Sequence, residues 1–298
     1  MAFSDTIAAV ERQVEHWLEV EFARHTAAPA RLLSAMRHAC LGGGKRFRPF
    51  LVIESARLFA VPAQAAAGTA IALELVHGYS LVHDDLPAMD NDALRRGRPT
   101  VWKAFDEWSA ILAGDALLTL AFEVLARTES AADAGVRAEL VLALARAAGA
   151  AGMVGGQCLD LEADKLGQPP QPGVAHVARL QAMKTGALIA CACECGAILG
   201  RAASAERGRL GRYGEALGLA FQISDDLLDA EGDAAVVGKA VGKDTAAGKA
   251  TWVTLLGVDG ARLRLAEAEA EAVGAIEPFG GAASSLVEAA RFLGRRRS

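Results

Sequence analysis

Apolar residues recur every three or four positions along almost the whole chain, and this spacing constrains the fold more than any other feature. Ile7, Val10, Val14, Trp17 and Leu18 follow it near the start, and Leu210, Leu217 and Phe221 follow it later. Such spacing places apolar side chains on one face of an α-helix. No segment alternates with a period of two, and the 52% of hydrophobic residues come mainly from Ala and Leu, which favour helices. The sequence therefore predicts an all-α fold without a sheet.

The breaks between the expected helices are short. They fall at residues 42–44, 61–62, 96–99, 167–170, 231–233 and 278–281, where Gly, Pro and polar residues gather. None of them is long enough to be a linker, and no repeat of fixed period occurs. A chain of 298 residues can bury a substantial core as one large domain. We therefore predict a single helical domain over residues 1–298.

Charge and hydropathy exclude some classes of partner. The formal net charge is −5 at pH 7, whereas binding to nucleic acid requires a basic surface, so no nucleic-acid partner is expected. The first twenty residues carry charges at helical spacing and no continuous apolar segment, so neither a signal peptide nor an anchor is predicted. These features predict a cytoplasmic protein.

The most apolar stretch, residues 185–199 (TGALIACACECGAIL), is shorter than a bilayer span and contains Glu194. We therefore expect a buried helix there and no membrane span. The stretch also holds Cys191, Cys193 and Cys195 among the five cysteines of the chain. A metal pair at Cys191 and Cys195 is conceivable, but no His or further thiol accompanies it. Small core residues in a reducing compartment explain these cysteines better.

A first group of carboxylates, Asp84, Asp85 and Asp90, follows the helical pattern of residues 71–86. Pro87 cannot donate a helical hydrogen bond, so the helix should bend or end there and let the chain return Asp90 towards Asp84. Carboxylate oxygens suit Mg²⁺, which is usually held by one or two carboxylates together with substrate phosphates. A solvated acidic helix end explains most isolated matches of this kind. The first group alone is therefore weak evidence for a site.

A second group of carboxylates lies in the segment FQISDDLLD. Gln222, Asp225 and Asp229 occupy positions i, i+3 and i+7, and hence one face of a helix. Two acidic faces opposed across a helical core would need cations to offset their charge. The two groups together indicate a site that binds a hard cation and a diphosphate.

Basic residues occur where a diphosphate site would use them. They are Lys45, Arg46 and Arg48 in GGGKRFRP, then Arg95 and Arg96, then Lys184 beside Thr185, and finally Lys239, Lys243 and Lys249. Arg can clamp phosphate oxygens in pairs, and Lys supplies a compact charge. GGGKRFRP lacks the GxxxxGK[ST] spacing of a nucleotide-binding loop, and no strand precedes it. Gln157 in GGQCLDLEAD is a further candidate for a polar role.

In this order, the segments GGGKRFRP, LVHDDLPAMDNDALRRGRPT, GGQCLDLEAD, MKTGALI and LAFQISDDLLD resemble the trans-polyprenyl diphosphate synthase family, most closely its bacterial farnesyl diphosphate synthases. The resemblance covers roughly residues 40–255. It implies an all-α domain of the isoprenoid synthase type, with helices around a deep central cavity and the two acidic motifs near its mouth. It also implies a homodimer.

The resemblance further implies a role for each candidate residue. Three Mg²⁺ ions would join the acidic motifs to the allylic diphosphate, with Asp84, Asp90 and Asp225 as the principal ligands and Asp85 and Asp229 in support. The residues implied to hold the allylic diphosphate are Arg95, Lys184, Thr185, Gln222, Lys239 and Lys249. Those implied to hold isopentenyl diphosphate are Lys45, Arg48, His77 and Arg96.

The implied reaction condenses isopentenyl diphosphate with dimethylallyl and then geranyl diphosphate to make farnesyl diphosphate. The allylic C–O bond ionises, the isopentenyl double bond attacks the carbocation, and the released pyrophosphate removes the proton. Asp84, Asp85, Asp90, Lys184 and Asp225 are the residues that this reaction would depend on most. The reaction needs no nucleophilic Ser or Cys.

Product length depends on the helix that carries the first acidic motif. Tyr79 lies five residues before Asp84, ~7.5 Å down the axis at ~1.5 Å per residue, where a growing chain would meet it. In the family, an aromatic residue there and a longer first motif with Pro are associated with a fifteen-carbon product. Ser80, beside Tyr79, lies on the same stripe as Asp84, as does His77. An ordinary core tyrosine is the alternative.

Three other functions remain open. A geranylgeranyl diphosphate synthase, with a twenty-carbon product, shares the motif set and differs mainly in its cavity floor. A class I terpene cyclase would carry N-D-x-x-S-x-x-x-E where this chain has Asp225 to Asp229 as DDLLD. A non-catalytic subunit of a synthase is weakly suggested by the spacing of Cys191 and Cys195, although the intact acidic and basic motifs argue against it.

Overall fold

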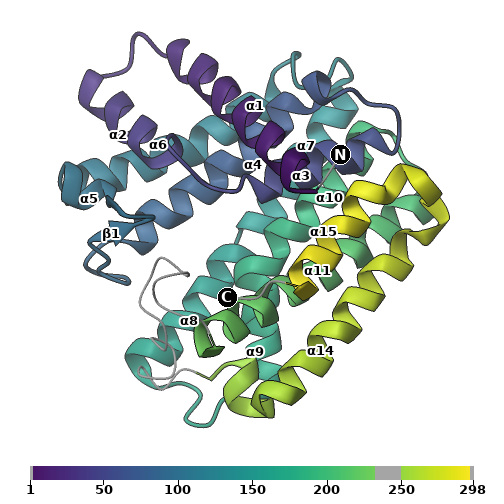
Figure 1. Cartoon of the computed structure of the whole chain (residues 1–298). Coiled ribbons are helices and arrows are strands. Elements are labelled where there is room, and N and C mark those ends of the chain that lie inside the picture. The colour runs from purple at the N-terminus through teal and green to yellow at the C-terminus, as the bar shows by residue number, and fades with distance from the viewer. Residues whose placement is uncertain (1–2, 232–249, 296–298) are drawn as a thin grey trace. The chain divides into compact units, whose positions relative to one another are not determined.

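The structure is a computed structural model that describes residues 3–231 and 250–295, and its regular structure there is almost entirely helical (Figure 1). By internal contacts the chain forms two compact units, Met1–Ile53 with Val61–Val141 and Glu54–Ala60 with Leu142–Ser298. The single domain over residues 1–298 remains a prediction. The boundary falls within the helices α3 (Phe47–Arg57) and α7 (Ala134–Ala148).

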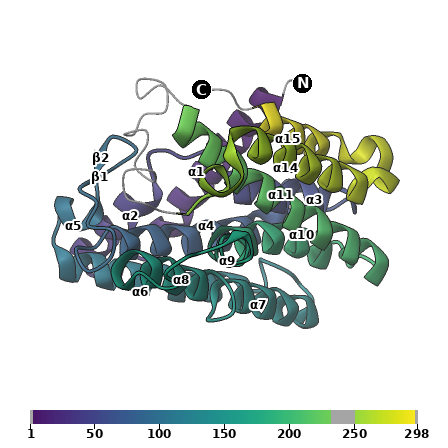
Figure 2. The ribbon, with the colours of Figure 1, turned by 90° about the horizontal axis from the view of Figure 1, so that it is seen from below.

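The first unit is built around α4 (Ala63–Asp84). Around it are α1 (Phe3–Ala23), α2 (Ala30–Cys40), α5 (Val101–Ala104), α6 (Glu107–Ala126) and a hairpin of β1 (Leu94–Arg95) with β2 (Arg98–Pro99). The α4 side chains Leu73, Leu75 and Val76 are fully buried, and α4 packs along α6 (Figure 2). Apolar residues on all sides of a helix are typical of a core helix. The hairpin is a small exception to the expected absence of strands.

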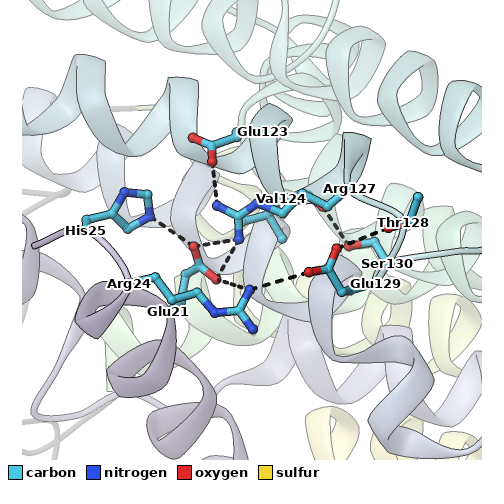
Figure 3. Close-up of polar contacts among 9 residues, drawn as sticks. All are labelled: Glu21, Arg24, His25, Glu123, Val124, Arg127, Thr128, Glu129 and Ser130. Atoms are coloured by element: carbon cyan, nitrogen blue, oxygen red, sulfur yellow. Dashed lines mark hydrogen bonds and ion pairs between the residues drawn. The ribbon is translucent and has the colours of Figure 1, made fainter. Parts of the chain in front are cut away.

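A buried carboxylate fixes the end of α6 against α1 (Figure 3). The side chain of Glu21 is 6% exposed and accepts hydrogen bonds on both oxygens from Arg127 at 2.9 Å, and one from His25 at 3.0 Å. Arg127 also donates to Glu123 at 2.5 Å. An unpaired carboxylate would be costly at this depth, so the arginine is what allows Glu21 to be buried.

The regular structure among the described residues of the second unit is helical. Its elements are α8 (Met153–Leu166), α9 (Val174–Gln181), the π-helix η1 (Ala182–Gly186), α10 (Ala187–Leu199), α11 (Ser204–Glu231), α14 (Trp252–Ile276), the 3₁₀ helix η2 (Glu277–Ala283) and α15 (Ser284–Arg295). Helices α11, α14 and α15 lie side by side in both views (Figures 1 and 2). The buried Tyr213 hydroxyl joins α11 to α15 by donating to the Leu286 carbonyl at 2.8 Å. Cys191, Cys193 and Cys195 are buried free thiols in α10, as core residues would be.

Four helical stretches are long and apolar enough to cross a membrane, judged by length and composition alone. They are Ala63–Asp84, Glu107–Ala126, Ala134–Leu166 and Val174–Leu199, the last being longer than the apolar stretch of residues 185–199 noted in the sequence. In the first, 72% of the most apolar window is buried within the protein. Much of that apolar surface is thus used for packing, and the absence of a membrane span remains a prediction.

Candidate active site

The first acidic motif forms a tight turn at the end of α4. The helix ends at Asp84, with Asp85 as its C-cap, and Pro87 follows. The backbone N–H of Asp90 then donates to the carbonyl of Asp84 at 2.8 Å. Asp84 is half-buried and Asp90 is exposed. The turn therefore brings these two residues together, as the proline led us to expect.

Asp85 makes a different set of contacts from Asp84. Its carboxylate is buried and accepts three hydrogen bonds from the guanidinium of Arg95, at 2.6, 2.9 and 3.1 Å. Burial raises the pKa of Asp85, and the hydrogen bond and charge of Arg95 oppose that rise. Burial would lower the pKa of Arg95, but the hydrogen bond and charge of Asp85, together with the charges of Asp84 and Asp92, raise it. Asp85 thus fixes an arginine beside the acidic turn.

The hairpin after the acidic motif positions the next arginine. Arg96 and Gly97, between β1 and β2, both have positive φ, 53° and 73°, as a two-residue hairpin turn of type I′ requires. Arg96 donates to the carbonyl of Gly43 at 2.8 Å, and a Cβ on Gly44 would lie 3.0 Å from its guanidinium carbon. A side chain at Gly44 of this glycine loop, residues 42–46, would therefore crowd the guanidinium of Arg96.

The arginine within that loop, Arg46, is structural. Its side chain is 2% exposed and donates to Glu74 of α4 at 2.5 Å, to Glu15 of α1 at 2.6 Å and to the Cys40 carbonyl at 2.5 Å. Glu15 also accepts from the backbone N–H of Gly42 at 2.5 Å. The loop is thus tied to two helices by an ion network. We did not predict this network from the sequence, although Glu74 stands out as a lone charge in the apolar run IALELV.

A cluster of cations surrounds His77. Burial, and then the charges of Arg48, Arg96 and Arg95, hold the pKa of His77 well below its usual range, so the imidazole is neutral near pH 7. Burial and the charge of Arg96 also lower the pKa of Arg48, and its Nε is buried without a partner among the described residues. Lys45 is exposed in the adjoining loop. Cations that repel one another in this way favour the binding of an anion.

A pocket of about 480 Å³, including space open to solvent, lies beside these groups in the first unit. Its lining includes Asp85, Arg95 and Arg96 together with the backbone of Gly42 and Gly43. Guanidinium groups and glycine backbone at a pocket wall are suitable for phosphate oxygens. Three of the predicted residues therefore meet at one concave surface.

Tyr79 and Ser80 lie on α4 before the acidic turn, as expected. Tyr79 is 6% exposed, and burial followed by the charge of Asp84 raises its pKa. Its ring meets the ring of His83 edge-on, with centroids 5.8 Å apart. The Ser80 hydroxyl donates to the His77 carbonyl at 2.9 Å, which satisfies it within the helix. Their role in product length remains a prediction.

In the second unit, the predicted Lys184 and Thr185 lie in the π-helix η1. Such single-turn π segments are frequent at functional sites. Lys184 donates to Asp160 of α8 at 2.6 Å. A Cβ on Gly156 would lie within 2.8 Å of the backbone N, Cα and Cβ of Lys184. The absence of a side chain at Gly156 therefore lets α8 pack directly against the segment that carries Lys184.

The second acidic motif directs its carboxylates to different sides of α11. Asp225 and Asp229 are half-buried, as is Gln222. Asp226 is buried and accepts a hydrogen bond from the backbone N–H of Trp252 at 2.8 Å, at the start of α14. It also accepts from Gln181 Nε2 at 3.4 Å. Asp226 therefore fixes α14 and α9 to α11, which leaves Asp225 and Asp229 as the candidate ligands.

A larger pocket in the second unit, of about 1200 Å³ including space open to solvent, brings together three of the predicted allylic-site residues, whereas Arg95 lines the pocket of the first unit. Lys184, Thr185 and Gln222 line it, together with Asp160 and Asp226. The predicted residues Lys239 and Lys249, with Lys243, lie outside the described residues. Gln157 has both side-chain amide atoms buried without a partner in the described part of the chain, which is consistent with a polar role.

Sequence comparison decides the family. A family model described as Polyprenyl synthetase matches residues 29–274, which is most of the chain. The chain belongs to the polyprenyl synthetase family. This confirms the resemblance drawn from the motifs.

Individual relatives match most of the length of this chain. A farnesyl diphosphate synthase of Haemophilus influenzae is 41% identical over 96% of the chain and 97% of its own length. Geranylgeranyl pyrophosphate synthase 9 of Arabidopsis thaliana is 42% identical over 78% of the chain and 65% of its own length. A solved FPP/GFPP synthase from Zymomonas mobilis has a TM-score of 0.86 and 44% identity, and the match covers 97% of this chain and 99% of that one. The last comparison confirms the all-α isoprenoid synthase fold.

The donor set of this polyprenyl synthetase fits a hard divalent cation. Asp84 and Asp90 supply carboxylate oxygens on either side of one turn, and Asp225 and Asp229 supply them from one helix. Among the described residues no three His, Cys, Asp or Glu side chains form a ready-made metal cluster. Mg²⁺ does not need one, because it keeps several waters and is held by one or two carboxylates plus substrate phosphates.

Proposed function

We propose that this polyprenyl synthetase condenses isopentenyl diphosphate with dimethylallyl and then geranyl diphosphate to make farnesyl diphosphate. The observation that carries the proposal is the end of α4 with its adjoining loops, where an acidic turn, Asp84 to Asp90, adjoins a cluster of cations around His77. The acidic turn can hold a metal–diphosphate group, and the cation cluster can hold the second diphosphate. The identity to a farnesyl diphosphate synthase over nearly the full chain supports the choice of substrates.

The residues of this chain bind and orient the two diphosphates. Asp84, Asp90 and Asp225 would hold Mg²⁺, three ions with the bound diphosphate, and Asp85 and Asp229 would support them. When bound, Mg²⁺ neutralises the diphosphate so that it can leave. The allylic C–O bond breaks, a C–C bond forms with the isopentenyl double bond, and the pyrophosphate takes the proton that is lost. Apolar walls exclude water from the carbocation.

Each diphosphate has its own set of residues. Lys184, Thr185, Gln222 and Arg95 would hold the allylic diphosphate, with Lys239 and Lys249 from the part of the chain that is not described. Lys184 is paired with Asp160 in this structure at 2.6 Å, so a diphosphate has to compete for it. Lys45, Arg48, His77 and Arg96 would hold isopentenyl diphosphate. A neutral His77 can donate one N–H to a phosphate oxygen without adding to the repulsion among the arginines.

Turnover in the presence of Mg²⁺ tests the function. The purified protein should make a fifteen-carbon product from isopentenyl and dimethylallyl diphosphates, with Tyr79 limiting the chain, and chelation of the metal should stop turnover. A dominant twenty-carbon product would favour a geranylgeranyl diphosphate synthase, to which the Arabidopsis relative points. A cyclic hydrocarbon would indicate a terpene cyclase. Absence of any turnover by this chain alone would favour a non-catalytic subunit.

Substitution of single carboxylates tests the metal ligands. We expect Asp84→Asn and Asp225→Asn each to lower kcat by at least about 10²-fold, the usual size for loss of one group that stabilises developing charge. Asp259→Asn is the matched control, because Asp259 is an exposed carboxylate on α14, away from either motif in sequence and not on α6. If Asp84→Asn matched the control, Asp84 would not be a ligand.

An apolar stripe on α6 supports the proposed homodimer. Trp108, Ile111 and Leu112 are 56%, 46% and 48% exposed, and exposed apolar faces of this kind mark interaction sites. We propose that a second copy of the chain covers this face. Ile111→Lys should shift the mass measured by light scattering from dimer to monomer, and a wild-type monomer at micromolar concentration would contradict the proposal. We also propose that the protein is cytoplasmic.

A further inference from the structure

His83 stands between the residue proposed to limit product length and the neighbouring helix α6. One turn after Tyr79 on α4, its ring meets that of Tyr79 edge-on, with an interplanar angle of 76° and centroids 5.8 Å apart. Its Nε2 lies 3.1 Å from the carbonyl oxygen of Ile111 on α6. A carbonyl can only accept, so Nε2 carries the proton in this contact. Two interactions from different helices thus fix the orientation of the imidazole.

The position of His83 depends on the absence of a side chain at Gly114 in α6. A Cβ on Gly114 would lie within 2.7 Å of three atoms of the His83 ring, so any side chain there would displace it. Gly114 is buried and lies within the continuous helix Glu107–Ala126. A glycine in a helix interior costs stability relative to alanine. The room that it provides for the imidazole is a reason for its presence.

We propose that His83 and Gly114 are positioning residues for Tyr79 and thereby help to set the length of the product. This inference rests on the proposed function, in which Tyr79 limits chain growth. A helical tyrosine has two accessible χ1 rotamers, and a ring held one turn later on the same face restricts the choice between them. With His83 in place the phenol stays where a growing chain meets it. With His83 displaced, Tyr79 can swing aside and admit a further five-carbon unit.

The experiment measures the ratio of twenty- to fifteen-carbon products at fixed substrate ratio, together with the total rate and the melting temperature. We expect Gly114→Ala and His83→Ala each to raise that ratio about two- to tenfold, the size expected for loss of an aromatic edge contact. Gly274→Ala on α14 is the matched control, because a Cβ there meets nothing within 4 Å. It should leave the ratio unchanged.

A double substitution separates positioning from general damage to packing. If Gly114 acts through His83, Gly114→Ala should change nothing further in the His83→Ala background, and neither change should matter once Tyr79→Ala has removed the phenol. A shift by Gly114→Ala that persists without His83 would overturn the proposal, as would wild-type ratios in both single variants. If the wild-type protein itself makes no fifteen-carbon product, the proposed function fails instead.

A further pair of variants keeps the test valid if Gly114→Ala does not fold. His83→Phe retains a ring beside Tyr79 without the hydrogen bond to Ile111, and it should keep the fifteen-carbon product. His83→Gln retains a donor without the ring, and it should raise the twenty-carbon fraction. The opposite order would show that the hydrogen bond to α6 matters and the ring contact with Tyr79 does not, which would contradict the proposal.

Discussion

Replacement of Glu74 by alanine should cost a large part of the stability of the first unit. The Arg46 side chain is 2% exposed and that of Glu74 is 6% exposed. Among residues 3–231 and 250–295, the substitution leaves the buried guanidinium with only Glu15, itself 29% exposed, as a charged partner. Removing one member of a buried pair typically costs about 3–5 kcal/mol. At about 2–4 °C per kcal/mol, the melting temperature should fall by about 6–20 °C.

The double variant Arg46→Met/Glu74→Leu should lose less stability than Glu74→Ala alone. It removes both charges, and replacement of a buried pair by apolar residues of similar volume is often neutral. Its KM for isopentenyl diphosphate should nevertheless rise, because Arg46 no longer ties to α4 and α1 the loop that carries Lys45 and leads to Arg48 at the start of α3. Compared with Glu74→Ala, the double variant would thus be more stable, yet it would bind isopentenyl diphosphate more weakly than the wild type.

Denaturant and thermal unfolding measure the first effect, and initial rates against isopentenyl diphosphate measure the second. Glu288→Ala is the control, because the pair of Glu288 and Arg291 is exposed on both sides, 46% and 44%, and such pairs contribute about 0–1 kcal/mol. A loss below about 1 kcal/mol for Glu74→Ala would refute the reasoning, since it would mean that the network is solvated. A double variant less stable than the single one would refute it as well.

Two further predictions concern the two substrate sites. The pKa of His77 is lowered well below 6.5 by burial and by Arg48, Arg96 and Arg95. The unfolded chain therefore takes up a proton near pH 6.5 that the folded chain does not, and stability should fall as pH decreases below about 6.5, by up to about 1.4 kcal/mol per pH unit. His77→Asn should remove this component from the pH dependence of denaturant unfolding, and an unchanged slope would contradict the assignment. Gly156→Ala should displace the backbone of Lys184 and lower kcat/KM for the allylic substrate by up to about 10²-fold. Gly211→Ala is the control and should leave kcat/KM unchanged, because a Cβ there meets nothing within 4 Å. Equal kcat/KM for the two variants would show that the contact of Gly156 with Lys184 does not position the lysine.

The features that the sequence predicted correctly are those set by residues close together in the chain. The helical period led to the all-α fold, and Pro87 led to a helix end after Asp84 with the return of Asp90, which the backbone hydrogen bond of 2.8 Å displays. The spacing of Gln222, Asp225 and Asp229 placed them on one face of α11. In each case the determining interactions lie within one or two helical turns, so the sequence alone contains them.

Contacts between distant segments were not predictable in the same way. Arg46 was grouped with the substrate-binding cations, yet its partners Glu15 and Glu74 lie 31 and 28 residues away and make it structural. Similarly, the spacing placed Asp225 on one face with Gln222 and Asp229, but it did not show what Asp226 would contact. Asp226 accepts a hydrogen bond from the backbone N–H of Trp252, 26 residues later. Which charged residue becomes buried depends on which segment packs against it, and a spacing rule does not contain that information.

The positions on α4 explain how one helix can serve several tasks with little interference. At about 100° per residue, Glu74 lies roughly 60° from His77 and 80° from Asp84, while Tyr79 and His83 lie on the other side of the helix, about 140° and 180° from Glu74. One face therefore binds Arg46 of the loop at residues 42–46, the next carries the residues proposed to bind the diphosphates, and the third carries the two aromatic rings. Because a buried helix is rigid, the rise of ~1.5 Å per residue fixes the distance between the acidic turn and the aromatic pair. Substitutions should consequently separate by face: those at Glu74 change stability, those at His77 and Asp84 change binding and rate, and those at Tyr79 and His83 change the product.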